Sequence, residues 1–394
     1  MTEEQVHLDG RQRLYLHVGL PKSGSTFLQS VLASNRLVLK QHGYVYPYVR
    51  NEGMFYAAVE MAGRPQRWGL APEDVAGTFA WLLRRGRRLG GTVVISHEIF
   101  GGADTGQIQT MGELLEGFEV HLVVTARDLG RTMTAEWQER VKNEQRHSFA
   151  EFADGVLEAI PSGPEDDQAA FWPTQNLGSL LDRWQALAPP ERIHVVVCPP
   201  RGADPGLLWT RFADALGLDP DAVDLSGVPV RNESLGAAQI SLLRQVLATL
   251  DGRLEQPWHS RVFKRWFAQT VLSGATSAKP VTPADVVHRL AGVSEQWIER
   301  IGSGGFAIHG DLADLLPGVG DSQALHPDDA DIAELADDLP RVIAEMLVRV
   351  KDLRVEIERL TAEKEQAEAL NETLNTELSE LRGEWDRRPR WWPF

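Results

Sequence analysis

Four short apolar segments alternate with helical patterns in the first half of the chain. The apolar segments are 14–18, 93–96, 120–126 and 193–198, and helical patterns lie between them at 27–40, 76–86 and 177–187. Apolar runs of this length, rich in valine and isoleucine, suit strands that are buried on both faces. Strands that alternate with helices indicate βαβ units. The sequence therefore predicts an α/β fold, a parallel β-sheet flanked by helices, with ligands bound at the carboxyl ends of the strands.

The first of these strands runs into a loop with the composition of a phosphate-binding turn. Gly19 ends the apolar run, Lys22 and Gly24 follow, and then the helical pattern 27–40 begins. Backbone N–H groups and a cation at a helix N-terminus commonly hold phosphate. The loop does not match the ATP-binding motif G-x-x-x-x-G-K-[ST], because Lys22 precedes Gly24. A capping turn is the simpler alternative, but a lysine inside the turn has no capping role.

The composition narrows the classes of function. The chain has 394 residues and a formal net charge of −16, which argues against general nucleic-acid binding. Its one cysteine, Cys198, excludes an internal disulfide and a cysteine-based zinc site. The histidines show no H-x₃-H or HExxH spacing, so no metal is implied. No apolar run approaches the ~18 residues of a membrane span. The polar N-terminus lacks the apolar core of a signal peptide, so we expect a cytoplasmic location.

The C-terminal part changes character three times. Residues 231–317 are mostly helical in pattern, and 318–340 contain many acidic residues but no lysine or arginine, which we interpret as an acidic linker. In 341–384, apolar residues recur at heptad spacing, which predicts a coiled-coil helix and a homo-oligomer. Asn371, at a core position of the heptad, favours a dimer. The alternative is an amphipathic helix packed on the globular part.

The last ten residues, 385–394, join arginines to tryptophans. This composition suits peripheral contact with a membrane interface or a protein groove, and chance composition is the alternative.

The segment Pro21-Lys22-Ser23-Gly24-Ser25-Thr26-Phe27-Leu28 resembles the 5′-phosphosulfate-binding loop, P-K-[ST]-G-[ST]-T-x-L, of the PAPS-dependent sulfotransferases. PAPS is 3′-phosphoadenosine 5′-phosphosulfate, the donor of the sulfuryl group. Residues 17–20, 43–47, 231–235 and 310–312 are also similar to actinobacterial sulfotransferase-like proteins, so the resemblance covers about 14–317. It implies a P-loop-type sheet in one sulfotransferase-like domain, 1–317.

The resemblance also implies roles for the loop. Lys22 and the backbone N–H groups of residues 23–26 would hold the phosphosulfate, so Ser23 and Gly24 belong to the predicted site. The hydroxyl groups of Ser25 and Thr26 would add donors, and Phe27 would stack on the adenine. Lys22 would also stabilise the charge that develops on the leaving oxygen during transfer.

Two further elements follow from the family pattern. Arg127, at the end of the strand 120–126, would hold the 3′-phosphate, but the serine expected eight residues later is Ala135, and Thr134 and Thr132 are the nearest hydroxyl groups. The catalytic base would be Glu98 or His97, with Glu98 the first choice; a capping role for these residues is the alternative. The R-K-G-x-x-G-x-W-K segment of cytosolic members is absent. Residues 231–235, or Arg261, Lys264 and Arg265, would have to replace it.

The predicted function is therefore metal-free, in-line transfer of a sulfuryl group from PAPS to a hydroxyl of a glycan, glycolipid or small natural product. One alternative is a non-catalytic scaffold that binds the product nucleotide, 3′-phosphoadenosine 5′-phosphate (PAP). The other is a kinase or NTPase with a degenerate P-loop. That reading would require GK[ST] and a strand-terminal aspartate for Mg²⁺, and neither is evident.

Overall fold

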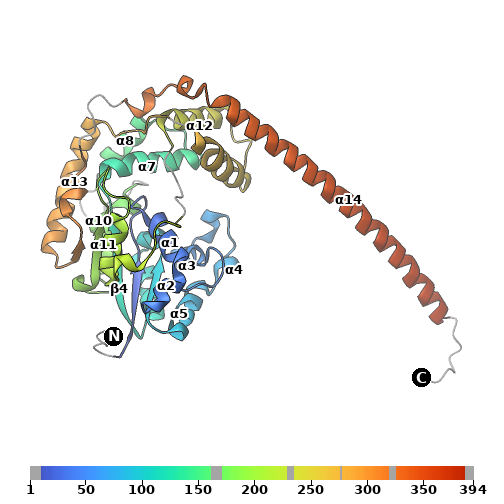
Figure 1. Ribbon diagram of the computed structural model, residues 1–394, viewed down its shortest axis with the longest axis horizontal. Helices are drawn as coiled ribbons and strands as arrows, with labels where there is room; N and C mark the ends of the chain where they lie inside the picture. The colour runs from blue at the N-terminus through green and yellow to red at the C-terminus, as the bar shows by residue number, and fades with distance from the viewer. Residues whose placement is uncertain (1–9, 161–170, 229–234, 276, 319–324, 387–394) are drawn as a thin grey trace. The chain divides into compact units, whose positions relative to one another are not determined.

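The computed structural model describes residues 10–160, 171–228, 235–275, 277–318 and 325–386 (Figure 1). The chain divides into two compact units, Met1–Glu334 and Leu335–Phe394. The functional residues predicted from the sequence all belong to the first unit.

The first unit is built on a sheet whose six described strands are all parallel, in the order β2-β3-β1-β4-β5-β6. The strands are β1 Gln12–His17, β2 Tyr44–Val45, β3 Thr92–Ser96, β4 Phe118–Ala126, β5 Ile193–Val197 and β6 Ala307–His309. The four predicted strands form the centre of the sheet, and the two short strands β2 and β6 form its edges. The predicted α/β fold with a parallel sheet flanked by helices is confirmed.

Helices separate the strands and continue beyond them. They are α1 Ser25–Ser34, α2 Arg36–Gln41, α3 Gly53–Ala62, α4 Pro72–Val75, α5 Thr78–Leu89, α6 Thr105–Leu114, α7 Leu129–Lys142, α8 Phe149–Glu158, α9 Trp172–Gln175, α10 Leu177–Trp184, α11 Leu207–Leu216, α12 Ala237–Leu250 and α13 Ala284–Ser303. A π-helix, η5, spans His259–Val271, and a short 3₁₀ helix, η2, spans Glu98–Gly102. The predicted mostly helical character of the C-terminal part is confirmed by α12, η5 and α13.

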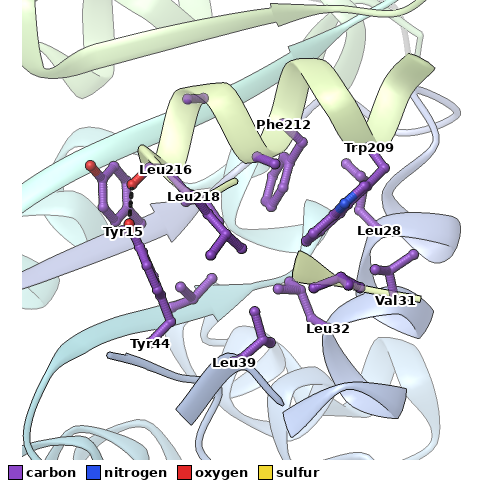
Figure 2. Close-up of a cluster of buried hydrophobic side chains, with 14 of the residues drawn as sticks. Tyr15, Leu28, Val31, Leu32, Leu39, Tyr44, Trp209, Phe212, Leu216 and Leu218 are labelled. Atoms are coloured by element: carbon purple, nitrogen blue, oxygen red, sulfur yellow. Dashed lines mark hydrogen bonds between the residues drawn. The ribbon is translucent and has the colours of Figure 1, made fainter. Parts of the chain in front are cut away.

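Different helices cover the two faces of the sheet. Successive side chains of a strand point to opposite faces, so neighbouring residues of one strand contact different helices. Val94 belongs to a buried cluster. The same cluster contains Leu28 of α1 and Phe212 of α11, which are labelled in Figure 2. Val93, the neighbour of Val94, points the other way, toward α5. There a Cβ on Gly86 would lie 2.8 Å from a Val93 methyl, so the close approach of α5 requires glycine.

The cluster in Figure 2 fixes the position of α1. Leu28, Val31 and Leu32 of this helix are 0% exposed and pack with Trp209 and Phe212 of α11. Full burial of one side chain of this size stabilises the fold by roughly 1.5–3 kcal/mol. The N-terminus of α1 is therefore held firmly at the carboxyl end of β1.

Part of the predicted acidic linker belongs to the first unit. The carboxylate of Asp328 accepts hydrogen bonds from the N–H groups of Phe149 (2.7 Å) and Ala150 (2.9 Å), and so caps the start of α8. The boundary between the two units falls within 318–340, of which 319–324 lie outside the described residues.

The second unit contains α14, a helix of 48 residues that spans Leu339–Asp386. At 1.5 Å per residue it is about 70 Å long. Its heptad positions Val350, Leu353, Ile357 and Leu360 are 46–61% exposed. The coiled coil over 341–384 and the oligomer stay predictions. Of the tail at 385–394, residues 387–394 lie outside the described residues.

Candidate functional site

The loop between β1 and α1 presents backbone donors at the helix N-terminus. Lys22 and Gly24 have φ angles of 66° and 83°, so the chain turns through left-handed conformations just before α1. Gly24 occupies the N-cap position and has no side chain to cap the helix. Within the described part of the chain, the N–H groups of Gly24, Ser25 and Thr26 find no acceptor. These donors and the helix dipole favour an anion here.

The carbonyl groups of this loop accept hydrogen bonds from side chains of other segments. Those of residues 21–23 accept hydrogen bonds from Gln175 (3.2 Å), Arg127 (3.0 Å) and the thiol of Cys198 (3.0 Å), in that order. In a trans peptide the C=O and the following N–H point in opposite directions. The N–H of Gly24 therefore points away from the buried side that contains Cys198.

A buried polar network supports the loop from the strand ends. Ser23 donates to the carbonyl of Leu20, so the hydroxyl of Thr125 donates to Ser23 (2.6 Å). His17 Nε2–H must then donate to Thr125 (3.0 Å), and His17 Nδ1 accepts from Ser96 (2.7 Å). This assignment makes His17 neutral, in agreement with burial, which lowers its pKa to about 4.

This network constrains two residues of the loop, Ser23 and Gly19. The Ser23 side chain is fully buried in the network, so the structure does not bring it to the surface of the loop. Gly19 must be glycine, because a Cβ there would lie 1.9 Å from the Thr125 hydroxyl.

The loop forms one wall of a cleft of about 600 Å³, between the start of α1, α7 and η5. Seven of the predicted site residues line this cleft: Lys22, Gly24, Ser25, Thr26, Phe27, Glu98 and Arg127. Ser23, His97 and Thr134 are not among its lining residues. The volume falls within the ordinary range for small-molecule sites.

Glu98 and His97 are adjacent in sequence but play different structural parts. Glu98 lines the cleft and accepts a hydrogen bond from Gln29 (2.9 Å). Burial opposes its ionisation, but His97 and hydrogen bonds from Gln29 and Ser25 prevail and lower the pKa of Glu98. His97 Nδ1 accepts from the N–H of Ile99 (3.2 Å) and so caps η2, and its ring lies against Phe55. Burial lowers the pKa of His97, so its ring is neutral at pH 7.

Arg127 follows β4 and enters the cleft beside the loop. One nitrogen, Nη1, donates to the Lys22 carbonyl, while its buried Nε has no partner among the described residues. Burial and the neighbouring Arg131 lower its pKa, although a guanidinium remains charged at neutral pH. The Thr134 hydroxyl donates to the Arg131 carbonyl within α7 (3.3 Å), and Ala135 lines the cleft instead.

Glu139 and Lys142 of α7 line the cleft although the sequence did not predict them, and Lys264 of η5, a candidate replacement for the missing segment, lines it as well. Glu139 accepts ion pairs from Lys22 (2.8 Å), Lys142 (2.9 Å) and Lys264 (2.6 Å). Burial opposes the charge on Glu139, yet the three lysines hold its pKa far below the usual range.

Of the replacements considered for the missing family segment, only some can be placed. Lys264 reaches the cleft, whereas Arg261 lies 5.7 Å from the Trp258 ring, and neither Arg261 nor Arg265 lines the cleft. Residues 231–234 of the alternative segment 231–235 lie outside the described residues, and Leu235 lines the cleft.

No curated protein and no known protein family matches the sequence. Among solved structures, the crystal structure of a sulfotransferase from Alicyclobacillus acidocaldarius is similar, with 16% sequence identity and a TM-score of 0.37. The similarity covers 63% of this chain and 98% of that one. At this level it assigns neither an activity nor a ligand to the chain.

The described residues show neither a membrane-spanning helix nor a metal-binding cluster. No helix in the described ranges is long and apolar enough to cross a membrane. The described residues also contain no group of three or more histidine, cysteine, aspartate or glutamate side chains placed to hold a metal ion.

Proposed function

We propose that this protein is a sulfotransferase that moves a sulfuryl group from PAPS to a hydroxyl of a glycan, a glycolipid or a small natural product. The observation that carries the proposal is a single cleft with three kinds of group. It contains a lysine beside free N–H groups at a helix N-terminus, a half-buried arginine and an ionised carboxylate, represented by Lys22, Arg127 and Glu98.

The donor groups of the cleft fit the nucleotide. The buried Nε of Arg127 has no partner in the described part of the chain, and a guanidinium suits a phosphate because it can donate two parallel hydrogen bonds. The N–H groups of Gly24, Ser25 and Thr26 suit the 5′-phosphosulfate. Phe27, at the cleft wall, offers an aromatic face to the adenine.

The bound nucleotide supplies an activated sulfuryl group on a phosphate leaving group. Lys22 and the free N–H groups would neutralise the negative charge that develops on the leaving oxygen, without reorganisation during the reaction. Glu98 is ionised and lines the same cleft, so it would accept the proton that the acceptor hydroxyl loses. His97 Nδ1 lies 3.7 Å from the Glu98 carboxylate but accepts from the Ile99 N–H, so His97 would hold the start of η2 beside Glu98 and would take no part in the proton transfer.

A non-catalytic PAP-binding scaffold is the second candidate. Helix α14 favours it, because sulfuryl transfer makes no use of a 48-residue helix with exposed apolar heptad positions. We propose that α14 joins two copies of the chain in a coiled coil, which is compatible with either function.

The experiment is transfer of labelled sulfuryl from PAPS to a panel of hydroxyl acceptors, in the presence of EDTA. Lys22→Met should lower kcat/KM by about 10²–10³, the usual effect of removing one group that stabilises developing charge. Lys40→Met is the matched control, because Lys40 is exposed at the end of α2 and does not line the cleft. Equal transfer by the wild type and Lys22→Met would contradict the mechanism. Binding of PAP without turnover on any acceptor would favour the scaffold.

A further inference from the structure

The most unusual feature of the cleft is the cluster of three lysines around one carboxylate. Lys22 Nζ and Lys142 Nζ lie 2.8 and 2.9 Å from the same Glu139 oxygen, Oε2, and Lys264 Nζ lies 2.6 Å from Oε1. Because Lys22 Nζ and Lys142 Nζ contact the same oxygen, these two ammonium groups must lie close to each other. The lysines come from three separate segments: the β1–α1 loop, α7 and η5.

This cluster holds more positive charge than Glu139 can balance. All four side chains are between 14% and 25% exposed, so solvent screens them less than it screens a surface pair. Burial and the two neighbouring ammonium groups lower the pKa of Lys142 despite the attraction of Glu139. The single negative charge of Glu139 thus offsets only part of the charge of the three lysines. An anion with more than one negative charge would offset more of it.

An ordinary ion pair on the same helix shows the difference. Among the described residues Glu136 pairs only with Arg140, at 3.4 Å, and it does not line the cleft. Glu139 lies one turn further along α7, at the cleft wall, within reach of lysines from distant parts of the chain. One cation suffices to pair with one carboxylate, whereas several cationic donors in a cleft suit a multiply charged oxyanion.

We propose that Lys22, Lys142 and Lys264 form one site for a multiply charged oxyanion group, a phosphate or sulfate, and that Glu139 fills this site as a built-in anion until the ligand displaces it. The proposal rests on the proposed function only for the identity of the nucleotide that carries the oxyanion group. Binding of the oxyanion group itself does not depend on the proposed function. It adds Lys142 and Lys264 to the residues that bind the ligand. It also makes Glu139 a competitor that sets the affinity of the cleft.

The test is calorimetric titration of the full chain with inorganic pyrophosphate and with PAP. Glu139→Gln keeps the shape of the side chain and removes the charge, so it should bind both anions about tenfold tighter than the wild type. Without an anion, its melting temperature should fall, because three ammonium groups then face one another, and pyrophosphate should restore it. Adding Lys264→Met to this variant should weaken pyrophosphate binding about tenfold.

Glu136→Gln is the matched control and should leave both affinities unchanged. Unchanged or weaker anion binding by Glu139→Gln would overturn the proposal and make Glu139 a structural partner of the lysines. If Glu139→Gln does not fold, Glu139→Asp, which draws the carboxylate back by one methylene, replaces it. It should bind pyrophosphate about two- to threefold tighter, and unchanged or weaker binding overturns the proposal. If pyrophosphate behaves as expected but PAP binds no tighter than pyrophosphate, the oxyanion site holds and the nucleotide part of the proposed function fails.

Discussion

Replacing Thr125 with valine should loosen the β1–α1 loop from the sheet. The Thr125 hydroxyl donates to Ser23 (2.6 Å) and accepts from His17 Nε2 (3.0 Å), and all three residues are fully buried. Valine has nearly the same shape but can make neither hydrogen bond. The substitution therefore removes the joint between β4, β1 and the loop without creating a cavity.

The expected loss follows from these contacts. His17 Nε2 is left without a partner in either neutral tautomer, which costs about 1–3 kcal/mol for a buried polar group. Loss of the bond between Thr125 and Ser23 adds about 1 kcal/mol, because Ser23 keeps its bond to the Leu20 carbonyl. The free energy of unfolding should fall by about 3 kcal/mol in total.

Urea denaturation of Thr125→Val measures this loss. The control is Thr132→Val, also buried, whose hydroxyl donates only to the Asp128 carbonyl (2.8 Å), a group that also accepts from the Thr132 N–H. This control should lose about 1 kcal/mol. A loss for Thr125→Val no larger than that of the control would refute the network as the support of the loop.

Three other predictions concern the base, the pH dependence and the second unit. Glu98→Gln should lower kcat about 10²-fold or more, while His97→Gln should lower the free energy of unfolding by about 1 kcal/mol and leave most of kcat; the reverse pattern would assign the base to His97. Burial lowers the pKa of His17 to about 4, and burial with neighbouring histidines lowers that of His194 to about 3, so both bind protons only on unfolding between about pH 6.5 and 4. The free energy of unfolding should be fully present above pH 6.5 and fall as the pH drops toward 4; equal urea midpoints at pH 7.5 and 5 would contradict this. Removing 341–384 and the tail should convert a dimer to a monomer in sedimentation equilibrium, and an unchanged mass would reject the coiled coil.

The central strands were predictable because each is a continuous apolar run buried on both faces. The edge strands were not, since β2 has two residues and β6 has three, too few to show a pattern. The turn between β1 and α1 was also predictable, because Gly19 ends the apolar run and a helical pattern follows it.

The far wall of the cleft was harder to predict, for a physical reason. Arg261, Lys264 and Arg265 lie within about one helical turn of one another. Ordinary helical spacing therefore cannot predict which of the three side chains faces the cleft. The segment forms a π-helix, whose wider turn changes which side chain faces α7. Glu139 lies in a charged helix, where ion pairs at i, i+3 and i, i+4 are ordinary, so the sequence does not single it out. Its contacts with Lys22 and Lys264 arise only because the fold brings these distant residues near.

The most direct test of the proposed function is whether the cleft recognises the 3′-phosphate that distinguishes PAP from 5′-AMP. Calorimetric titration should show that PAP binds about 100-fold tighter than 5′-AMP, as expected for two charge-assisted hydrogen bonds. Arg127→Met should remove most of this difference and leave 5′-AMP binding little changed. Binding of 5′-AMP or ATP–Mg²⁺ as tightly as PAP would contradict the account.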